Sequence, residues 1–357
     1  MGQLSVLGSI FLYVVTFGLS GLLSIVPVRN KFIKILLVML PPVLLATFRY
    51  KVGYDYGSYI YGYEVFSQRE FSEIFQDYQT GDPIAFSLVT KFAAMLGSER
   101  IYLMVLAILA LLPATIFILT EWTDKKTLPL VIFCHMFNGF LFSLSACKQG
   151  IAISILMLSL KYVYNRKPLK FLLCVAVAFL FHSTAIVFIV VYLFLNSKGN
   201  MSTFKKILIV AGCIFVILNL QPILEGFLDG KYEGYATNIV EGKNRTFWLY
   251  SAITLIFLFF RDKFVEIDKR NDLFIMMMAV GAIFQYLGFT NAFSKRIGEY
   301  FLIAEVFLIP QSVYVFTQNS RKVVNLLIVV YIVALFLIAT PTAASGMGFV
   351  PYQYKFW

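Results

Sequence analysis

The sequence predicts an all-α polytopic membrane protein, and three observations lead to that prediction. Of the 357 residues, 60% are hydrophobic and only 14% are charged, and the mean hydropathy is +0.81. A soluble globular domain carries roughly 25% charged residues. Apolar stretches near the roughly 20 residues that a helix needs to cross a bilayer recur along the whole chain. Short basic connections separate them, so we expect residues 1–357 to form a single integral membrane domain.

The apolar runs correspond to about twelve membrane-spanning segments. The runs cover residues 4–26, 32–48, 101–120, 128–147, 149–164, 169–181, 184–196, 203–220, 247–260, 272–291, 297–317 and 322–340. Two connections are much longer than the others, 49–100 and 221–246. Within the first, the apolar stretch 84–97 is short and contains Lys91, so we expect an amphipathic helix lying on the membrane surface.

The distribution of charge predicts the orientation in the membrane. The segments "PVRNKFIK", "TDKK", "KYVYNRKPLK", "NSKGNMSTFKK", "RDKFVEIDKR" and "NSRK" hold most of the 30 Lys and Arg. Basic connections of this kind are typical of the cytoplasmic side, which places the loops 49–100 and 221–246 outside. The net charge of +11 therefore reflects topology. It does not indicate nucleic-acid binding, because the basic residues form no stripe with interleaved aromatics.

Residues 169–196, "LKFLLCVAVAFLFHSTAIVFIVVYLF", allow two interpretations. One is a single long tilted helix, and the other is a pair of short helices with a hinge at "FHST". The hairpin keeps the later basic loops in the cytoplasm, so the charge rule favours it. Each arm would rise only about 20 Å, less than the roughly 30 Å hydrocarbon core. The hairpin therefore predicts that His182 is held inside the helix bundle.

Cysteines and acidic clusters give no sign of a metal or cofactor. The four cysteines lie within or beside apolar runs, and none forms a C-x-x-C pair. This pattern favours neither zinc nor a disulfide. Asp55 has no second carboxylate near it in the sequence, and the outer side shows no His/Cys cluster with ligand spacing. We therefore expect a protein that works without a metal or a cofactor.

Polar residues gather at the predicted outer face, where the spans begin or end. They are Arg49, Lys51 and Asp55; Lys148 and Gln149; His182; Lys295, Arg296, Glu299 and Tyr300, with Glu305 further in; and the aromatic tail "GFVPYQYKFW". Taken singly, the arginines can be snorkelling residues, the histidine a core residue and the tyrosines an interfacial aromatic belt. Ionisable groups at membrane depth usually pair or line a pathway. Several cations with tyrosines at one face suit an anionic, sugar-bearing or lipid-linked ligand.

At these residues the chain resembles the EpsG-type branch of the Wzy polysaccharide polymerases, membrane enzymes of bacterial surface-glycan assembly. The matching pieces are "FRYKVGYDYGSY", "KQGIAISI", "FLFHSTAIV", "RIGEYF" and "VPYQY". Their order and spacing extend over nearly the whole chain. The chain departs from the pattern at Lys148, where an arginine is expected; lysine keeps the charge but loses the planar fork.

The resemblance implies a polymerase that joins undecaprenyl-pyrophosphate-linked oligosaccharide repeat units on the outer side of the bacterial inner membrane. The lipid pyrophosphate would be the leaving group. The product would be an O-antigen, a capsule or an exopolysaccharide. The resemblance also implies a fold related to the GT-C membrane glycosyltransferases, without a nucleotide sugar or a metal. Candidate partners are a flippase and a chain-length regulator of the same pathway.

This chemistry assigns roles to the polar residues. Arg49 and Arg296 are the candidates for stabilising negative charge on the leaving pyrophosphate. Asp55 and His182 are both candidates for the base that accepts the proton of the acceptor hydroxyl, and the sequence leaves the choice open. The candidate substrate-binding residues are Lys51, Tyr54, Tyr56, Lys148, Gln149, Lys295, Glu299, Tyr300 and Tyr352.

Two other functions remain as alternatives. A lipid-linked oligosaccharide flippase also has about twelve spans, but transporters often show internal repeats and polar groups at the bilayer midplane. This sequence has no recognisable repeat, and its polar residues gather toward one face. A membrane acyltransferase that modifies surface glycans with a His and Arg site is the second alternative. The polymerase is the preferred interpretation.

Overall fold

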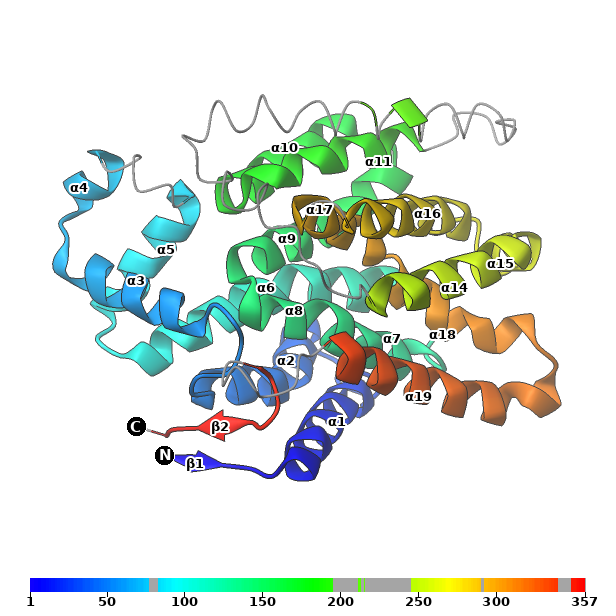
Figure 1. Ribbon diagram of the computed structural model, residues 1–357. Helices are drawn as coiled ribbons and strands as arrows, with labels where there is room; N and C mark the ends of the chain where they lie inside the picture. Colours follow the sequence, from blue (N-terminus) through cyan, green and yellow to red (C-terminus); the bar gives the residue numbers. More distant parts are fainter. Residues whose placement is uncertain are drawn as a thin grey trace. The chain divides into compact units, whose positions relative to one another are not determined.

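A computed structural model describes residues 1–76, 83–194, 211–212, 215, 245–289, 292–339 and 348–356 (Figure 1). In these residues the regular structure is helical apart from one two-stranded sheet, which confirms the all-α prediction. The chain divides into two compact units. The first unit contains Met1–Leu158, Val177–Ser183 and Ile328–Trp357, and the second contains Ser159–Ala176 and Thr184–Leu327.

Five helical segments in the described ranges are long and apolar enough to cross a membrane. They are α1 (Val6–Leu23), α2 (Lys31–Phe48), α6 (Glu99–Glu121), the segment Leu128–Ser145, and Gln318–Ile338, which includes most of α19 (Arg321–Ala339). Shorter apolar helices add to them. The protein is therefore a multi-pass membrane protein. The count of about twelve spans and the orientation stay predictions, and the run 203–220 and the loop 221–246 lie largely outside the described residues.

Helices α1 and α2 pack against each other in the first unit (Figure 1). The turn between them ends at Asn30, whose side chain accepts hydrogen bonds from the backbone of Phe32 and Ile33 and so caps α2. Gly21 allows α1 to pack closely against the backbone at Pro129, because a Cβ atom there would be 2.6 Å from the carbonyl oxygen of Pro129. Helix α2 ends at Phe48, directly before Arg49.

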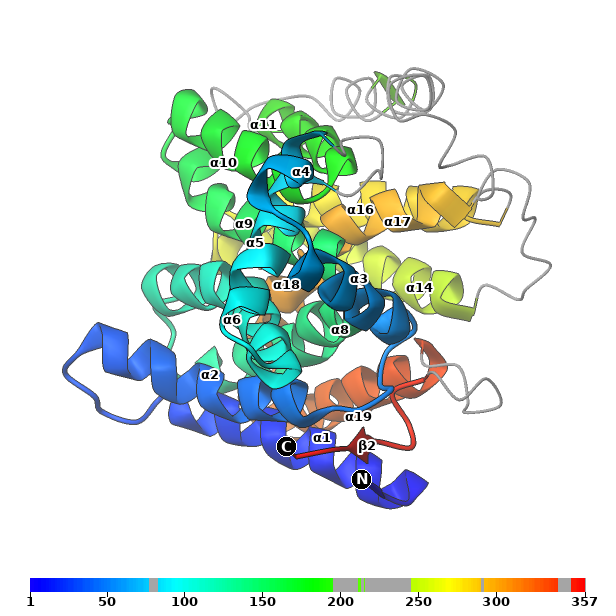
Figure 2. The same ribbon diagram turned by 90° about the vertical axis from the view of Figure 1, so that its left-hand side faces the viewer.

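The long connection after α2 is itself largely helical (Figure 2). It contains α3 (Tyr56–Gln68), α4 (Phe71–Gln76) and α5 (Ile84–Met95). The predicted helix at 84–97 is confirmed as α5; its position on a membrane surface stays a prediction. One face of α5 packs on α3, where the rings of Phe86 and Tyr59 lie 5.6 Å apart. The ammonium group of Lys91 donates to the carbonyl groups of Ser67 and Arg69 and thus fastens α5 to the end of α3.

A sharp corner follows the fourth span. The segment consists of α7 (Leu128–His135), a π-helix (Met136–Phe140) and α8 (Leu141–Ser145). The helix breaks at Ala146, with φ −99° and ψ 64°, before α9 begins (Cys147–Tyr164). Gly150 is needed for this corner because a Cβ atom there would lie 2.3 Å from the Cβ atom of Ser143. The corner places Lys148 and Gln149 in the first turn of α9.

The predicted hairpin at His182 is confirmed. Helix α10 (Pro168–Phe181) ends immediately before His182, and a 3₁₀-helix (Ser183–Ile189) and α11 (Val190–Leu193) follow. The ring centroids of Phe171 and Tyr192 are 5.3 Å apart. One continuous helix would separate these two residues by about 30 Å. The chain therefore reverses direction at the "FHST" segment.

The second unit is built around a tight pair of helices. It contains α14 (Arg245–Phe259), α15 (Arg261–Ile267), α16 (Asn271–Leu287), α17 (Ala292–Leu302) and α18 (Glu305–Val315). A Cβ atom on Gly281 of α16 would lie 2.8 Å from the side chain of Leu302, and one on Gly298 would lie 3.2 Å from the carbonyl of Gly281. These glycines let α16 and α17 approach closely, as small residues do in membrane helix pairs.

The structure differs from the sequence prediction at the run 297–317. This run is divided between α17 and α18, with a turn at Ile303 and Ala304. Glu305 begins α18, where the helix dipole favours an acidic residue in the first turn. The hydropathy of the run does not reveal the turn because the two turn residues, Ile303 and Ala304, are apolar and buried.

The two ends of the chain pair with each other in the first unit, as both ribbon views show (Figures 1 and 2). Strand β1 (Gly2–Gln3) is antiparallel to β2 (Gln353–Tyr354). On its other side the tail meets the end of α2: Tyr50 N–H donates to the carbonyl of Gln353 at 2.9 Å, and Lys355 N–H donates to the carbonyl of Phe48 at 3.0 Å. The tail therefore holds the main chain on both sides of Arg49.

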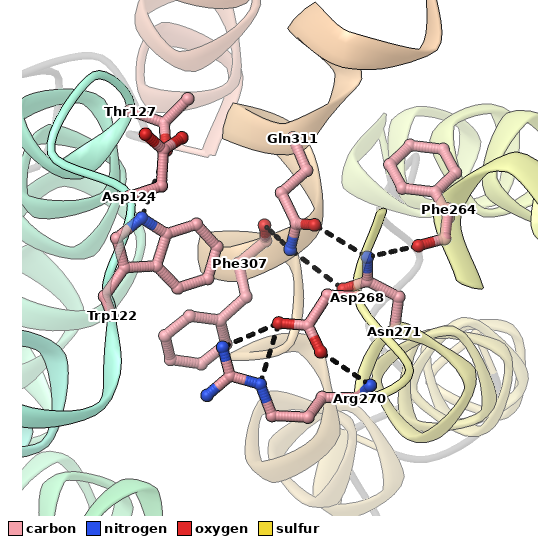
Figure 3. A network of polar contacts seen from close by, with 9 residues as sticks. All are labelled: Trp122, Asp124, Thr127, Phe264, Asp268, Arg270, Asn271, Phe307 and Gln311. Carbon is pink, nitrogen blue, oxygen red and sulfur yellow. Dashed lines mark hydrogen bonds and ion pairs between the residues drawn. The ribbon is translucent and has the colours of Figure 1, made fainter. Parts of the chain in front are cut away.

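A closed polar network joins α16 and α18 in the second unit (Figure 3). Asn271 donates to Gln311 Oε1 at 2.7 Å, and Gln311 donates to Asn271 Oδ1 at 2.9 Å. The same two amides also donate to the backbone carbonyls of Phe264 and Phe307. Both side chains are buried, and their exchange of hydrogen bonds satisfies groups that would otherwise be costly there.

Candidate functional site

Arg49 is the centre of the candidate site in the first unit. It follows the last residue of α2 and is only 2% exposed. Its Nη1 group donates to the carbonyl of Leu144, at the end of α8, at 2.7 Å. Its Nε group has no hydrogen-bond partner among the described residues. Because an unsatisfied donor on a buried cation is costly, the arrangement favours a guanidinium that receives an anionic ligand.

The loop after Arg49 sits on the same end of α8. Lys51 and Gly53 both have positive φ angles, 53° and 97°. A Cβ atom on Gly53 would be 2.4 Å from the carbonyl oxygen of Leu144, so only glycine fits there. The N–H group of Tyr54 donates to Ser145 Oγ at 3.0 Å. The "KVGYD" segment is thus held against the end of α8, which also contacts the guanidinium of Arg49.

Two tyrosines of α3 complete the wall beside Arg49. The Cζ atom of Arg49 lies 5.8 Å from the centre of the Tyr56 ring, and the Tyr56 hydroxyl donates to Glu99 Oε1 at 2.8 Å. The Tyr59 hydroxyl accepts a hydrogen bond from the N–H group of Cys147 at 2.8 Å. Burial, followed by the hydrogen bond to Glu99, raises the pKa of Tyr56, so its hydroxyl stays protonated and acts as a donor.

The other predicted residues of this unit lie around the same point. Lys148 follows Cys147, whose N–H group donates to the Tyr59 hydroxyl of α3, and Asp55 immediately precedes the same helix. Asp55 is partly buried directly before α3, and Lys148 lies with its ammonium group 5.0 Å from the centre of the Phe86 ring. Gln149 is buried beside Lys148. Lys51 and Tyr54 are exposed, so they are the members most open to a large ligand.

Tyr352 supports the site from the tail. Its hydroxyl donates to the carbonyl of Leu45, in the last turn of α2, at 2.6 Å. Its ring packs edge-on against Tyr13, with centroids 5.9 Å apart. These contacts give Tyr352 a role in holding the end of α2. The substrate contact predicted for it stays a prediction.

A second group of predicted residues lies on α17 in the second unit. Lys295 and Arg296 lie four and three positions before Glu299 on α17, and Glu299 accepts a hydrogen bond from Gln285 at 2.9 Å. The hydroxyl of the fully buried Tyr300 lies 3.0 Å from Thr184 Oγ1. Helix α17 therefore presents two cations and a carboxyl group together.

His182 lies between α10 and the 3₁₀-helix and is partly buried. Its N–H group donates to the carbonyl of Ala178 at 2.9 Å, which ends α10. It is two residues before Thr184, the partner of Tyr300. The predicted site residues thus form a group around Arg49 and a group on α17. Their convergence on one ligand stays a prediction.

Two residues of the first group, Glu99 and Arg100, were not predicted from the sequence. Arg100 is 4% exposed and donates to the carbonyl of Arg49 at 2.8 Å. It lies 51 positions away in the chain, so no local pattern connects the two. One signal was available, because a cation in the first turn of a helix opposes the helix dipole.

His135 was also missed. It is buried in the segment Leu128–Ser145, directly before the π-helix, and neither ring nitrogen has a hydrogen-bond partner among the residues described. Ionisable residues at membrane depth are functional candidates by default, and π-helices often mark functional places. The presence of a histidine inside the apolar run 128–147 was the signal that could have found it.

The described residues contain no group of three or more His, Cys, Asp or Glu that could hold a metal ion. The prediction that the protein works without a metal remains untested by this observation. Chemically, the first group offers a buried guanidinium, a carboxyl group and aromatic rings at the end of a membrane helix. That combination can bind an anion and orient a sugar next to it.

Comparison with known proteins gives a family and no individual relative. No curated protein matches the chain, and no solved structure matches it, so a relation to the GT-C enzymes stays a prediction. The model of the EpsG family matches residues 32–354, from α2 to the last strand. The match includes both groups of candidate residues and supports a polysaccharide-polymerase type of function. The chain belongs to the EpsG family.

Proposed function

We propose that this protein is a metal-independent glycosyltransferase that joins undecaprenyl-pyrophosphate-linked oligosaccharide repeat units. The reaction takes place on the outer side of the bacterial inner membrane. The observation that carries the proposal is the buried Arg49 guanidinium, whose Nε lacks a partner among the described residues and which lies at the end of a membrane helix. Membership of the EpsG family supports the general class of function.

The reaction needs cations where the leaving group develops charge. The bond between the anomeric carbon of the growing chain and the lipid pyrophosphate breaks, and the pyrophosphate leaves as an anion. A new bond forms between that carbon and a hydroxyl oxygen of the next lipid-linked unit, whose proton passes to a base. Arg49 stabilises the leaving oxygens, and Arg296 is its predicted counterpart on α17. Asp55 and His182 remain the two candidates for the base.

The decisive experiment uses purified protein in liposomes with a lipid-linked repeat unit as the only sugar substrate. We expect products with a ladder of increasing length, and Arg49→Lys protein to form that ladder about a hundredfold more slowly. Transfer of intact lipid-linked units across the bilayer without a ladder would instead identify a flippase. Acyl transfer from an added acyl donor would identify an acyltransferase.

A deletion strain gives an independent test in cells. If the protein is a polymerase, the surface glycan should shorten to a single repeat unit while remaining on the cell surface. Complete loss of surface repeats would contradict the proposal and favour the flippase. The length of the glycan on a gel is the measurement, and restoration by the wild-type gene is the control.

A further inference from the structure

The first turn of α6 carries a buried cation at a place where a helix disfavours one. Arg100 is 4% exposed and follows Glu99, the first residue of α6. The positive end of the helix dipole repels a cation at this place, whereas it favours an acidic residue such as Glu99. Burying a guanidinium adds a cost of desolvation. The position therefore needs a compensating interaction from another part of the fold.

The C-terminal end of α2 supplies that interaction. Arg100 Nη1 donates to the carbonyl oxygens of Thr47 at 3.2 Å and of Arg49 at 2.8 Å. The last carbonyl groups of a helix lack partners within the helix and lie at its negative end, where a cation is favourable. Arg100 thus fixes the main chain of Arg49, the residue at the centre of the candidate site.

A second connection leads to the side chain of Arg49. Glu99 Oε1 lies 3.3 Å from Arg100 Nη2 and accepts the hydrogen bond of the Tyr56 hydroxyl at 2.8 Å. The Tyr56 ring lies 5.8 Å from Arg49 Cζ, within the range of a cation–π contact. While its hydroxyl is bonded to Glu99, the ring is held in place beside the guanidinium.

We propose that Arg100 and Glu99 are positioning residues for Arg49. Arg100 holds the backbone of Arg49, and Glu99 holds the ring of Tyr56 against its side chain, so the start of α6 sets the direction of the guanidinium. A displacement of about 1 Å at a reacting centre can cost a factor of about a hundred in rate. The inference rests on the proposed function, because it concerns the group that binds the leaving pyrophosphate.

The test starts with Tyr56→Phe, which removes the hydroxyl and keeps the ring. We expect its kcat for polymerisation in liposomes to fall about tenfold, with the KM for the lipid-linked unit changed less and the thermal stability close to that of the wild type. Tyr61→Phe is the matched control, because Tyr61 lies on the same helix and is exposed; it should leave both constants unchanged. An unchanged kcat in Tyr56→Phe would overturn the inference.

A double variant shows whether Tyr56 acts through Arg49. If it does, Arg49→Lys/Tyr56→Phe should be no slower than Arg49→Lys alone, because the group to be positioned has already gone. Multiplication of the two losses would mean that Tyr56 acts independently and would overturn the inference. Arg100→Lys is expected to lower kcat as Tyr56→Phe does. If Arg100→Lys protein does not accumulate in the membrane, the comparison of Arg49→Lys, Tyr56→Phe and their double variant decides.

The result also separates this inference from the proposed function. Normal ladders from Arg49→Lys protein, or none from the wild type, would overturn the assigned site and the positioning role together. An impaired Arg49→Lys variant with a normal Tyr56→Phe variant would leave the proposed function standing and remove only the positioning role.

Discussion

Arg49 and the Asn271–Gln311 pair are both buried polar groups, but the surrounding protein satisfies them differently. Asn271 is 0% exposed and Gln311 is 3% exposed, and their amides exchange two hydrogen bonds (Figure 3). Arg49 is equally buried, and among the described residues its guanidinium makes a hydrogen bond to Leu144 and a cation–π contact with Tyr56, while its Nε is without a partner.

The difference teaches how to separate structural from functional polar residues in this protein. A pair whose donors and acceptors are used within the protein stabilises the fold and offers little to a ligand. A buried charge with a donor left over lowers stability unless something else binds it. Substitutions in the two groups should therefore differ in their effects on activity and on stability.

Replacing Arg49 by lysine should remove most of the activity. Lysine keeps the positive charge and can still contact Leu144, but it lacks the planar fork that binds two oxygens at once. We expect a loss of about a hundredfold in polymerisation rate, with normal abundance in the membrane. Arg69→Lys is the control, since that guanidinium lies over the Phe66 ring, outside both groups. Near-normal chain length from Arg49→Lys would return Arg49 to a purely structural role.

Replacing one member of the Asn271–Gln311 amide pair should lower the stability of the protein and leave its activity unchanged. In Gln311→Leu protein, the buried side-chain amide of Asn271 loses its partner, so the free energy of unfolding should fall by about 1–3 kcal/mol. The polymerisation rate per folded molecule should not change. Thermal unfolding and rate are measured on the same preparation. The double variant Asn271→Leu/Gln311→Leu should recover part of the loss, and the comparison fails if Gln311→Leu is stable but inactive.

Gly53→Ala should lower both the stability and the polymerisation rate of the protein. The added methyl group meets the carbonyl of Leu144, and the positive φ of this residue costs alanine about 1–2 kcal/mol. We expect lower stability together with slower polymerisation, because the loop shares Leu144 with Arg49. Gly57→Ala is the matched control: it lies in α3 with no atom within 4 Å of the new group, and should be neutral or slightly stabilising.

Removal of metal ions should have the smallest effect. If arginines stabilise the leaving pyrophosphate, polymerisation by purified protein should continue at an unchanged rate in excess chelator. Loss of turnover in chelator that Mg²⁺ or Mn²⁺ restores would mean that the guanidinium groups are not sufficient. Measuring the ladder before and after addition of the ion distinguishes the two outcomes.

The sequence predicts the parts of this fold that have a local signal. The charge rule, together with the polar "FHST" segment, predicted the hairpin at His182, and hydropathy predicted the five long spans found among the described residues. The turn between α17 and α18 was missed because Ile303 and Ala304 are apolar and buried, although Glu305 directly after them is a polar residue inside the apolar run. Glu99 was missed for a different reason: an acidic residue at a helix start looks ordinary, and its partner Tyr56 lies 43 positions earlier.

The candidate site was predicted at the level of residue types and only in part at the level of contacts. The "FRYKVGYDYGSY" motif placed Arg49, Asp55 and Tyr56 together because they are close in the sequence. The support from the tail could not be predicted, since nothing in "VPYQY" specifies which backbone it will pair with. Strand pairing over such a distance depends on the tertiary fold.

The pairing of the tail with the end of α2 also sets an order of events during biosynthesis. Gln353 is added to the chain roughly 300 residues after Tyr50, its hydrogen-bond partner, which at normal translation speeds means a delay of tens of seconds. During that delay the main chain beside Arg49 lacks the strand that holds it. A chain that ends between α19 and Gln353 therefore contains every helix that the structure describes but lacks the strand that holds the main chain beside Arg49, so we expect it to be catalytically silent.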